Sequence, residues 1–456
     1  MVLVALALPL LLGVTGLAFD VGYLEYQKRL VQTAADAAAI AGAIDLAYGS
    51  VCGSGGTTLC ASTAALAATA ANGFANGSGT VGHRVAVTVN NPPLNGPHTA
   101  ANDPTHNTNY VEVIVQAPAP TFFLNMIGIT SYTSVAGRAV ATSTSGDCVF
   151  ALNSSASGAL TFEPLSLNDI NAPACAIIVD SSNSSALSGI FTLTFITASQ
   201  INVVGGVSCF FCTFNPAVVT GATALADPLA YLPAPTVAAC SPVIPANIST
   251  GTVTINPAFG CYQVAISGNA NVTLMPGEYS SITVSNNIAP TVTFNPGLFI
   301  IQGSGGLALT GLGATITGTG VTFYLGPSAG GVSVATGGSI FNNIQLVAQT
   351  TGTYAGILFY QDRSNTNQAC VGGCGNSISG LLNFLQVQGA LYFPSATLSF
   401  DGCCQTTGSS GGCTPPYCTA YEIVVADKIN MAWNYFGDDY SSLPGGSPVK
   451  KTLLVE

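Results

Sequence analysis

Fourteen cysteines are the side chains of this sequence with the most obvious chemistry. An even number of cysteines in a chain of 456 residues indicates an oxidising compartment and structural disulfides. Fourteen cysteines allow far too many pairings for the sequence to reveal which of them are joined. The cysteines expected in disulfides are Cys52, Cys60, Cys148, Cys175, Cys209, Cys212, Cys240, Cys261, Cys370, Cys374, Cys403, Cys404, Cys413 and Cys418.

Zinc binding and redox chemistry are the alternatives for these thiols. The four cysteines within 403–418 could form a tetrahedral zinc site, but an adjacent cysteine pair is poor zinc spacing and no histidine lies nearby. The spacing Cys209-Phe-Phe-Cys212 matches a redox motif by count alone, because no thioredoxin-like βαβ pattern surrounds it. We therefore expect no metal ion and no cofactor.

Acidic residues are the remaining candidates for catalysis. A polysaccharide-cleaving site needs carboxylates on one face, often with basic residues or calcium. Only two basic residues, Arg363 and Lys428, occur between 147 and 430, and each follows an acid, as in a solvated surface charge pair. No HExxH or phosphate-loop pattern occurs, so we expect no enzyme. The acids in this range are Asp147, Glu163, Asp169, Asp180, Asp227, Glu278, Asp362, Asp401, Glu422 and Asp427.

The composition excludes one class of partner and favours another kind of surface. Eight basic residues and a net charge of −11 exclude nucleic-acid binding. Only 6% of residues are charged while 48% are hydrophobic, so the chain can form a large core under a surface of hydroxyl and amide groups. Such a surface could carry glycans. Triplets of the N-x-S/T type begin at Asn76, Asn153, Asn183, Asn247 and Asn271.

The first 19 residues contain no charge and nearly reach the length of a membrane crossing at about 1.5 Å per residue. Pro9 predicts a kink or a loosened turn, and Gly13 and Gly16 are small residues on a helix-packing face. No basic residue precedes the run, which predicts either that a leader has been removed or that the sequence is otherwise incomplete at its start. The residues expected to serve assembly or anchoring are Leu6, Leu8, Pro9, Leu10, Leu11, Leu12, Gly13, Gly16 and Asp20.

A second, amphipathic half continues this helix to residue 48. It is rich in alanine, the best helix former, and Gly49 gives a stop. Asp20 stands at the junction of the two halves. Its carboxylate is expected either to mark the membrane–water boundary or to pair with an amine of a neighbouring subunit.

A resemblance to a known family rests on ALALPLLLG, Asp20-Val21-Gly22 and Leu30-x-Gln32-x-Ala34-Ala35-Asp36-Ala37-Ala38-Ala39. This segment, about a tenth of the chain, resembles the N-terminus of TadG-like proteins of the tight-adherence (Flp, type IVc) pilus system. The resemblance implies an exported, membrane-anchored or pilus-associated protein with a pilin-like helix. Better-known type IV pilins carry a glutamate near the mature N-terminus, whereas position 5 here is Ala5.

The rest of the chain predicts an α+β, mostly β fold. Residues 49–145 predict a small α/β domain with alternating strands at 84–90 and 110–116. Residues 146–432 contain short β-rich stretches between Gly and Asn turns and predict a right-handed parallel β-helix, with a two-sheet sandwich as the alternative. Residues 433–456 form a closing segment.

These patterns lead to three hypotheses about function. The first is a structural subunit of an extracellular pilus-like filament, whose N-terminal helix packs with copies of itself in the core. The second is a membrane-anchored pilus-associated protein or surface adhesin that does not polymerise. The third, a polysaccharide-modifying enzyme, is disfavoured by the scattered acids. The first two imply export to the cell surface, the membrane before assembly, and the pilus assembly machinery as partner.

Overall fold

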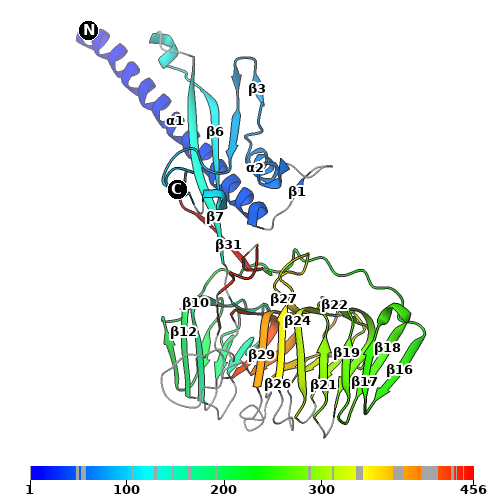
Figure 1. Ribbon diagram of the computed structural model, residues 1–456. Helices are drawn as coiled ribbons and strands as arrows, with labels where there is room; N and C mark the ends of the chain where they lie inside the picture. The colour runs from blue at the N-terminus through cyan, green and yellow to red at the C-terminus, as the bar shows by residue number, and fades with distance from the viewer. Residues whose placement is uncertain are drawn as a thin grey trace. The chain divides into compact units, whose positions relative to one another are not determined.

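The computed structural model describes residues 2–47, 51–52, 58–104, 107–127, 131–145, 148–162, 167–189, 193–285, 289–310, 313–334, 343–372, 384–401, 420–432, 436–437, 439–444 and 446–456. The chain divides into two compact units, and the remaining description concerns each of them by itself (Figure 1). Unit 1 contains Met1–Thr144 and Lys450–Glu456, and unit 2 contains Ser145–Val449. Of the expected closing segment 433–456, the last seven residues belong to unit 1 and the others to unit 2.

Helix α1 (Val2–Ala47) is the longest element of unit 1, and its helical backbone continues through Pro9. The helix buries its second half on a face of small residues, with Val31, Ala35, Ala38 and Ala39 fully inaccessible to solvent. Small side chains let a helix approach a sheet closely. A Cβ atom added at Gly137 would lie 2.8 Å from the Cα atom of Gln32, so this position admits only glycine.

An antiparallel sheet lies against α1 in unit 1, with the strand order β31-β7-β6-β5. Its long strands alternate buried valines and alanines with exposed residues, as a half-buried sheet does. The final strand pairs next to β7 although some 300 residues separate them in the chain. The unit comprises β1 (Val51–Cys52), β2 (Thr58–Leu59), α2 (Cys60–Ala71), β3 (Gly79–Thr80), β4 (His83–Arg84), β5 (Ala86–Asn90), η1 (Asn107–Asn109), β6 (Tyr110–Pro120), η2 (Leu124–Ile127), β7 (Tyr132–Ser145) and β31 (Lys450–Leu454).

The described residues of unit 2 form one large sheet of 23 parallel strands that stack rung upon rung. These strands are β8 (Val149–Ala151), β9 (Leu160–Phe162), β10 (Leu167–Val179), β11 (Leu187–Gly189), β12 (Leu193–Val203), β13 (Val207–Cys209), β14 (Cys212–Asn215), β15 (Val219–Thr220), β16 (Val243–Ile248), β17 (Thr252–Ile255), β18 (Cys261–Ile266), β19 (Asn271–Leu274), β20 (Gly277–Val284), β21 (Thr291–Phe294), β22 (Gly297–Ile301), β23 (Leu307–Leu309), β24 (Thr315–Leu325), β25 (Val332–Val334), β26 (Asn343–Ala348), β27 (Ile357–Gln361), β28 (Ala369–Val371), β29 (Phe384–Asp401) and β30 (Glu422–Ala432). The turn η3 (Pro257–Phe259) joins β17 to β18.

Like side chains stand above one another in this stack because the parallel register repeats from rung to rung. Val253 pairs with Val272, Val272 with Val292, and Val292 with Ile316, all facing the interior. An aromatic column inside the stack continues through Tyr279, Phe299, Phe323, Phe359 and Phe393, with neighbouring ring centroids 5.3–6.3 Å apart. Such repeated contacts bury a continuous core that no single rung could form alone.

The order of the rungs in space differs from their order in the chain. The chain enters the stack at β8, which pairs with β10 on one side and with β30 on the other. From β8 the chain builds outward through β10 and β12 to β14 and β15 at one end. It then starts again at the opposite end with β16 and builds back through β18 and β20 to β30, beside its point of entry.

Residues 221–242, here called the strap, connect the two ends of the stack. The strap runs along the outside of the rungs, from β15 to β16, as an extended green trace in Figure 1. Leu229 and Leu232 of the strap are buried in a second apolar cluster on the outer face, together with Tyr324, Tyr360 and Tyr392. The strap thus covers an outer surface of the stack as well as joining its ends.

Candidate assembly and anchoring site

The first half of α1 is the part of the chain predicted to serve assembly. The structure describes the backbone of this helix from residue 2, but the side chains at positions 1–12, which include Leu6, Leu8, Pro9, Leu10, Leu11 and Leu12, lie outside the described part. From residue 13 onward the helix presents apolar side chains to solvent. Val14 is 61% exposed, Leu17 48% and Val21 50%.

The carboxylate of Asp20 connects this helix to the turn between β6 and β7. It accepts hydrogen bonds from the backbone N–H groups of Phe122 at 3.0 Å, Phe123 at 2.8 Å and Leu124 at 2.7 Å, and the residue is 1% exposed. Burial alone would raise the pKa of Asp20, but the three N–H donors outweigh that effect and hold the pKa below its usual value. An interaction within the chain, which the sequence did not predict, therefore occupies the carboxylate.

Three aromatic rings cluster beside the helix at this level, and we call Phe19, Phe122 and Phe123 the aromatic collar. The ring of Phe19 meets Phe122 at 5.7 Å and Phe123 at 6.0 Å between centroids, edge to face in both cases. Each ring remains 44–57% exposed. Tyr23 packs against Phe122 from the next turn of the helix at 5.4 Å. The collar is therefore an ordered apolar surface that still faces solvent.

The two small residues predicted to lie on a helix-packing face have different surroundings. A Cβ atom at Gly16 would lie 2.6 Å from the ring of Phe123, so this glycine is covered by the collar of its own chain. No other atom lies within 4 Å of the corresponding position at Gly13, which stays open. Of the two glycines, only Gly13 offers space for close approach by another helix.

Gln32, part of the motif that carries the resemblance, joins the second half of α1 to the sheet. Its side-chain amide donates to the backbone oxygen of Arg138 at 2.7 Å and accepts from the backbone N–H of Arg138 at 3.2 Å. The same amide nitrogen donates to Asp36 at 2.7 Å, one helical turn further on. The motif thus places a polar clamp between helix and strand, while its alanines allow the close approach.

A buried charge network connects the strands of the antiparallel sheet in unit 1. Glu112, which has no exposed surface, accepts from the Arg138 guanidinium at 2.6 Å, from Asn90 at 2.8 Å and from the N–H of Leu94 at 3.0 Å. Burial opposes ionisation of Glu112, but these donors lower its pKa overall. Arg138 also pairs with Glu456, so the end of the chain is tied into the same network.

The described cysteines form disulfides that stabilise unit 2. Cys148 pairs with Cys175 across neighbouring rungs, Cys209 pairs with Cys212 around a tight turn, and Cys240 pairs with Cys261. Cys370 is also disulfide-bonded. The side chains of Cys52 and Cys60, and the residues Cys374, Cys403, Cys404, Cys413 and Cys418, lie outside the described part of the chain.

The expectation that Asp362 and Arg363 form a solvated surface charge pair is wrong. Arg363 instead donates to the strap carbonyls of Leu229, Ala230 and Leu232 at 3.0–3.2 Å, because the strap carbonyls converge where the guanidinium fork can reach them. Its guanidinium also lies 5.5 Å from the centre of the Tyr392 ring. Asp362 accepts a hydrogen bond from the hydroxyl of Tyr324 at 2.6 Å.

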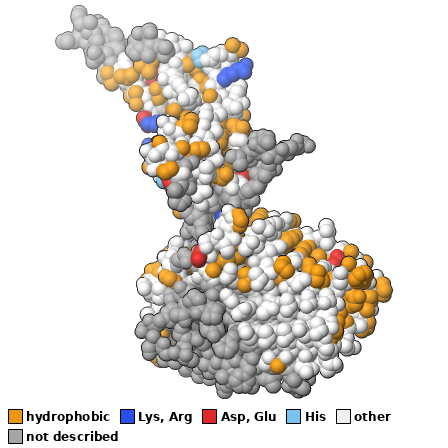
Figure 2. Space-filling model, viewed as in Figure 1, with side chains coloured by type: hydrophobic (Ala, Val, Ile, Leu, Met, Phe, Trp, Pro, Cys, Tyr) orange, Lys and Arg blue, Asp and Glu red, His pale blue; other side chains and the backbone are white. Residues whose placement is uncertain are grey.

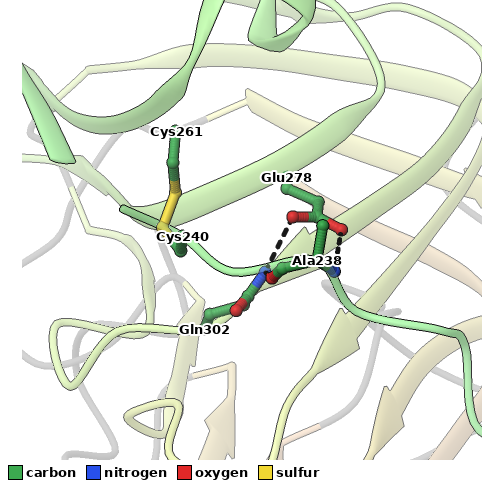
Figure 3. Close-up of a disulfide and its surroundings, with 5 residues drawn as sticks. All are labelled: Ala238, Cys240, Cys261, Glu278 and Gln302. Carbon is green, nitrogen blue, oxygen red and sulfur yellow. Dashed lines mark hydrogen bonds between the residues drawn. A yellow bond between two sulfur atoms is a disulfide. The ribbon is translucent and has the colours of Figure 1, made fainter. Parts of the chain in front are cut away.

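Two further acids of unit 2 also hold structure in place. Figure 3 shows the end of the strap, where Glu278 accepts the N–H of Ala238 at 2.7 Å and the side chain of Gln302 at 3.0 Å beside the Cys240–Cys261 disulfide. The side-chain nitrogen of Asn153 donates to both carboxylate oxygens of Asp427, at 2.9 and 3.1 Å. Figure 2 shows few charged side chains on the visible face of unit 2.

The matched segment coincides with the helix that carries this candidate site. Residues 1–45 match the model of a family described as putative Flp pilus-assembly TadE/G-like proteins, which confirms the resemblance seen in the sequence. The match supports a protein of the pilus system at the cell surface. Comparison with curated proteins and with solved structures gives no match. Among the described residues, no helix is both long enough and apolar enough to cross a membrane.

Proposed function

Because its first 45 residues are TadE/G-like, we propose that the chain is a structural subunit of an extracellular pilus-like filament. The N-terminal helix packs with copies of itself in the filament core, and unit 2 lies on the outside. The observation that carries this proposal is the exposed apolar surface of α1 at Val14 and Leu17, within the charge-free run 1–19, and at Val21 just beyond it. Water solvates such a surface poorly, so lipid or sister helices must shelter it.

The proposal includes a fold and a surface for the outer part. The parallel stack is a right-handed β-helix that forms a stiff rod, since every rung is hydrogen-bonded to the next. Its hydroxyl- and amide-rich surface is a place for glycans. The proposal assigns no catalysis to unit 2, and support for this comes from Asp362, Arg363 and Glu278, whose side chains are engaged in holding the chain together.

A second candidate is a membrane-anchored, pilus-associated protein or adhesin that does not polymerise. It is favoured by Gly16, because the ring of Phe123 already occupies the space that a neighbouring helix would need there. Electron microscopy of the purified full chain separates the two. Regular fibres support the filament subunit, and particles that stay single in detergent support the anchored protein.

The substitution Leu11→Arg tests the role of the helix in both candidates. A charge within the apolar run should abolish assembly and membrane retention while unit 2 remains folded. The matched control is Leu94→Arg, which introduces the same charge at a leucine that is 69% exposed. Normal assembly and retention of the Leu11 variant would overturn the proposal. Turnover of any member of a glycan panel would overturn the absence of catalysis.

A further inference from the structure

The aromatic collar lies where the apolar part of α1 meets the folded part of unit 1. Phe122 and Phe123 come from the turn after β6, whereas Phe19 comes from the helix, so two distant segments supply one exposed surface. Three half-exposed phenylalanines, with the ring of Phe19 against both Phe122 and Phe123, are unusual for a surface that faces only water. The surface continues directly into the charge-free run 1–19.

The carboxylate of Asp20 lies at this level but is not presented to the surroundings. The three backbone N–H groups of the turn cover the charged carboxylate, and the residue is almost fully buried. The same contacts fix the height of Phe122 and Phe123 along the helix, and Gly16 gives the ring of Phe123 its place against the helix backbone. The collar is therefore apolar and held at one level.

The first exposed charges follow further along the helix. Glu25, Lys28 and Arg29 are exposed, and the two basic residues lie about 12 Å beyond Asp20 at 1.5 Å per residue. Aromatic rings at the boundary of the hydrocarbon, followed by basic side chains at the level of the phosphates, is the order that a bilayer favours. A water-facing surface or a helix contact would not require this order.

From this arrangement we infer that the aromatic collar is a membrane-interface contact that sets how deeply the helix enters the bilayer before assembly. The partner is the boundary between the acyl chains and the headgroups of a phospholipid bilayer. The helix up to residue 19 lies on the lipid side, and Lys28 and Arg29 face the phosphates. Asp20 and Gly16 are positioning residues for the collar. This inference rests on the proposed function, because it requires that the helix enters a membrane.

Tryptophan fluorescence in vesicles tests the level of the collar. The full chain carries one tryptophan, Trp433, which is replaced in a Trp433→Phe background. Phe122→Trp then reports on the collar, and Phe195→Trp, at a residue of unit 2 that is similarly exposed (52% against 49%), is the matched control. Each protein is reconstituted into vesicles of phosphatidylcholine and phosphatidylglycerol whose acyl chains carry bromine either near the glycerol or near the chain end.

We expect bromine near the glycerol to reduce emission at position 122 about twofold or more, and bromine near the chain end to reduce it less. Emission at position 195 should not change. Vesicle-bound protein without quenching at 122 would overturn the inference and leave the anchoring function intact. A blue-shifted emission at 122 in lipid-free fibres, combined with no quenching at 122 in vesicle-bound protein, would overturn it in favour of a second copy as the partner. Failure to bind vesicles at all would overturn both the inference and the membrane step of the proposed function.

Discussion

In unit 1, individual polar contacts join elements that are far apart in the chain, whereas in unit 2 the same apolar contact is repeated from rung to rung. Asp20, Gln32 and the Glu112–Arg138 pair each occur once and connect helix, turn and strand in unit 1. The column that includes Phe323 and Phe359 has a similar contact above and below each ring. The difference predicts that the stability of unit 1 depends mainly on its charged contacts, and that the stability of unit 2 depends mainly on packing in its core.

The largest effect that would sharpen this comparison is expected from Phe359→Ala. The ring has no exposed surface and lies between Phe323 and Phe393, so its removal leaves a cavity that costs about 3–5 kcal/mol. The measurement is denaturant unfolding together with hydrogen exchange of peptides from each unit. Unit 2 should lose protection while unit 1 keeps it. Phe259→Ala, at a residue that is 77% exposed, is the control and should change stability by less than about 0.5 kcal/mol.

Arg138→Met should produce the next largest effect, this time in unit 1. Removing the cation leaves Glu112 buried without its charged partner, and because Arg138 is itself partly exposed we expect a loss of about 2–3 kcal/mol. Exchange of β6 and β7 amides should accelerate while the rungs of unit 2 stay protected. Arg84→Met, at an exposed arginine, is the matched control. Equal destabilisation by both variants would contradict a special role for the network.

The substitution Arg363→Met tests whether a single polar contact is as important for the stability of unit 2 as for that of unit 1. This guanidinium holds three carbonyl groups of the strap, so its loss should free that segment at a cost of about 2 kcal/mol. Limited proteolysis should cut within residues 221–242 in the variant and not in the parent. The core of the stack should stay protected, since the rungs themselves do not depend on Arg363. Cleavage spread across the rungs would show that the strap carries the stack.

Acidification should give the smallest and most selective effect. Asp20 and Glu112 have lowered pKa values in the folded unit 1, so they contribute stability above their unfolded values of about 3.9 and 4.3, and lose it as the pH falls through the folded values. In unit 2 burial raises the pKa of Asp180, whereas hydrogen bonds lower those of Asp362 and Asp439, so the effects partly oppose one another. Protection factors of the Phe122–Leu124 amides, which correct for the slower intrinsic exchange at low pH, should fall first between pH 7 and 3. Simultaneous loss of protection in both units would contradict the assignment.

The sequence predicted the elements whose causes are local. The charge-free run and the alanine pattern predicted α1, and the short β-rich stretches between Gly and Asn turns predicted the parallel strands of unit 2. Local signals of this kind depend on neighbours within a few turns or strands. The family resemblance rests on the same local segment, residues 1–45.

The contacts that define the candidate site could not be predicted because their partners are distant in the chain. Asp20 meets the N–H groups of residues 122–124, and nothing near either segment marks the other. Gly137 and Gln32 approach each other in the same way. The adjacent phenylalanines at 122 and 123 were the one available signal, since two large apolar side chains in a turn indicate a contact with another apolar surface.

The order of the rungs was equally hidden. The rungs carry similar turns and similar inward-facing residues. The sequence therefore does not reveal whether β8 lies at one end of the stack or within it. The strap is the feature that could have revealed it. A stretch of 22 residues with prolines and without a strand pattern is longer than a turn between adjacent rungs needs.

The pairing of β8 with β30 has a consequence for how such a protein can change over generations. Val149 and Val424 stand opposite each other on neighbouring strands, about 4.8 Å apart in the usual spacing, although 274 residues of chain lie between them. Unit 2 therefore has its two ends together, as an inserted domain does, and it interrupts unit 1 between Thr144 and Lys450. Rungs can be gained or lost far from that junction without altering the ends, so the length of the stack can change independently of unit 1.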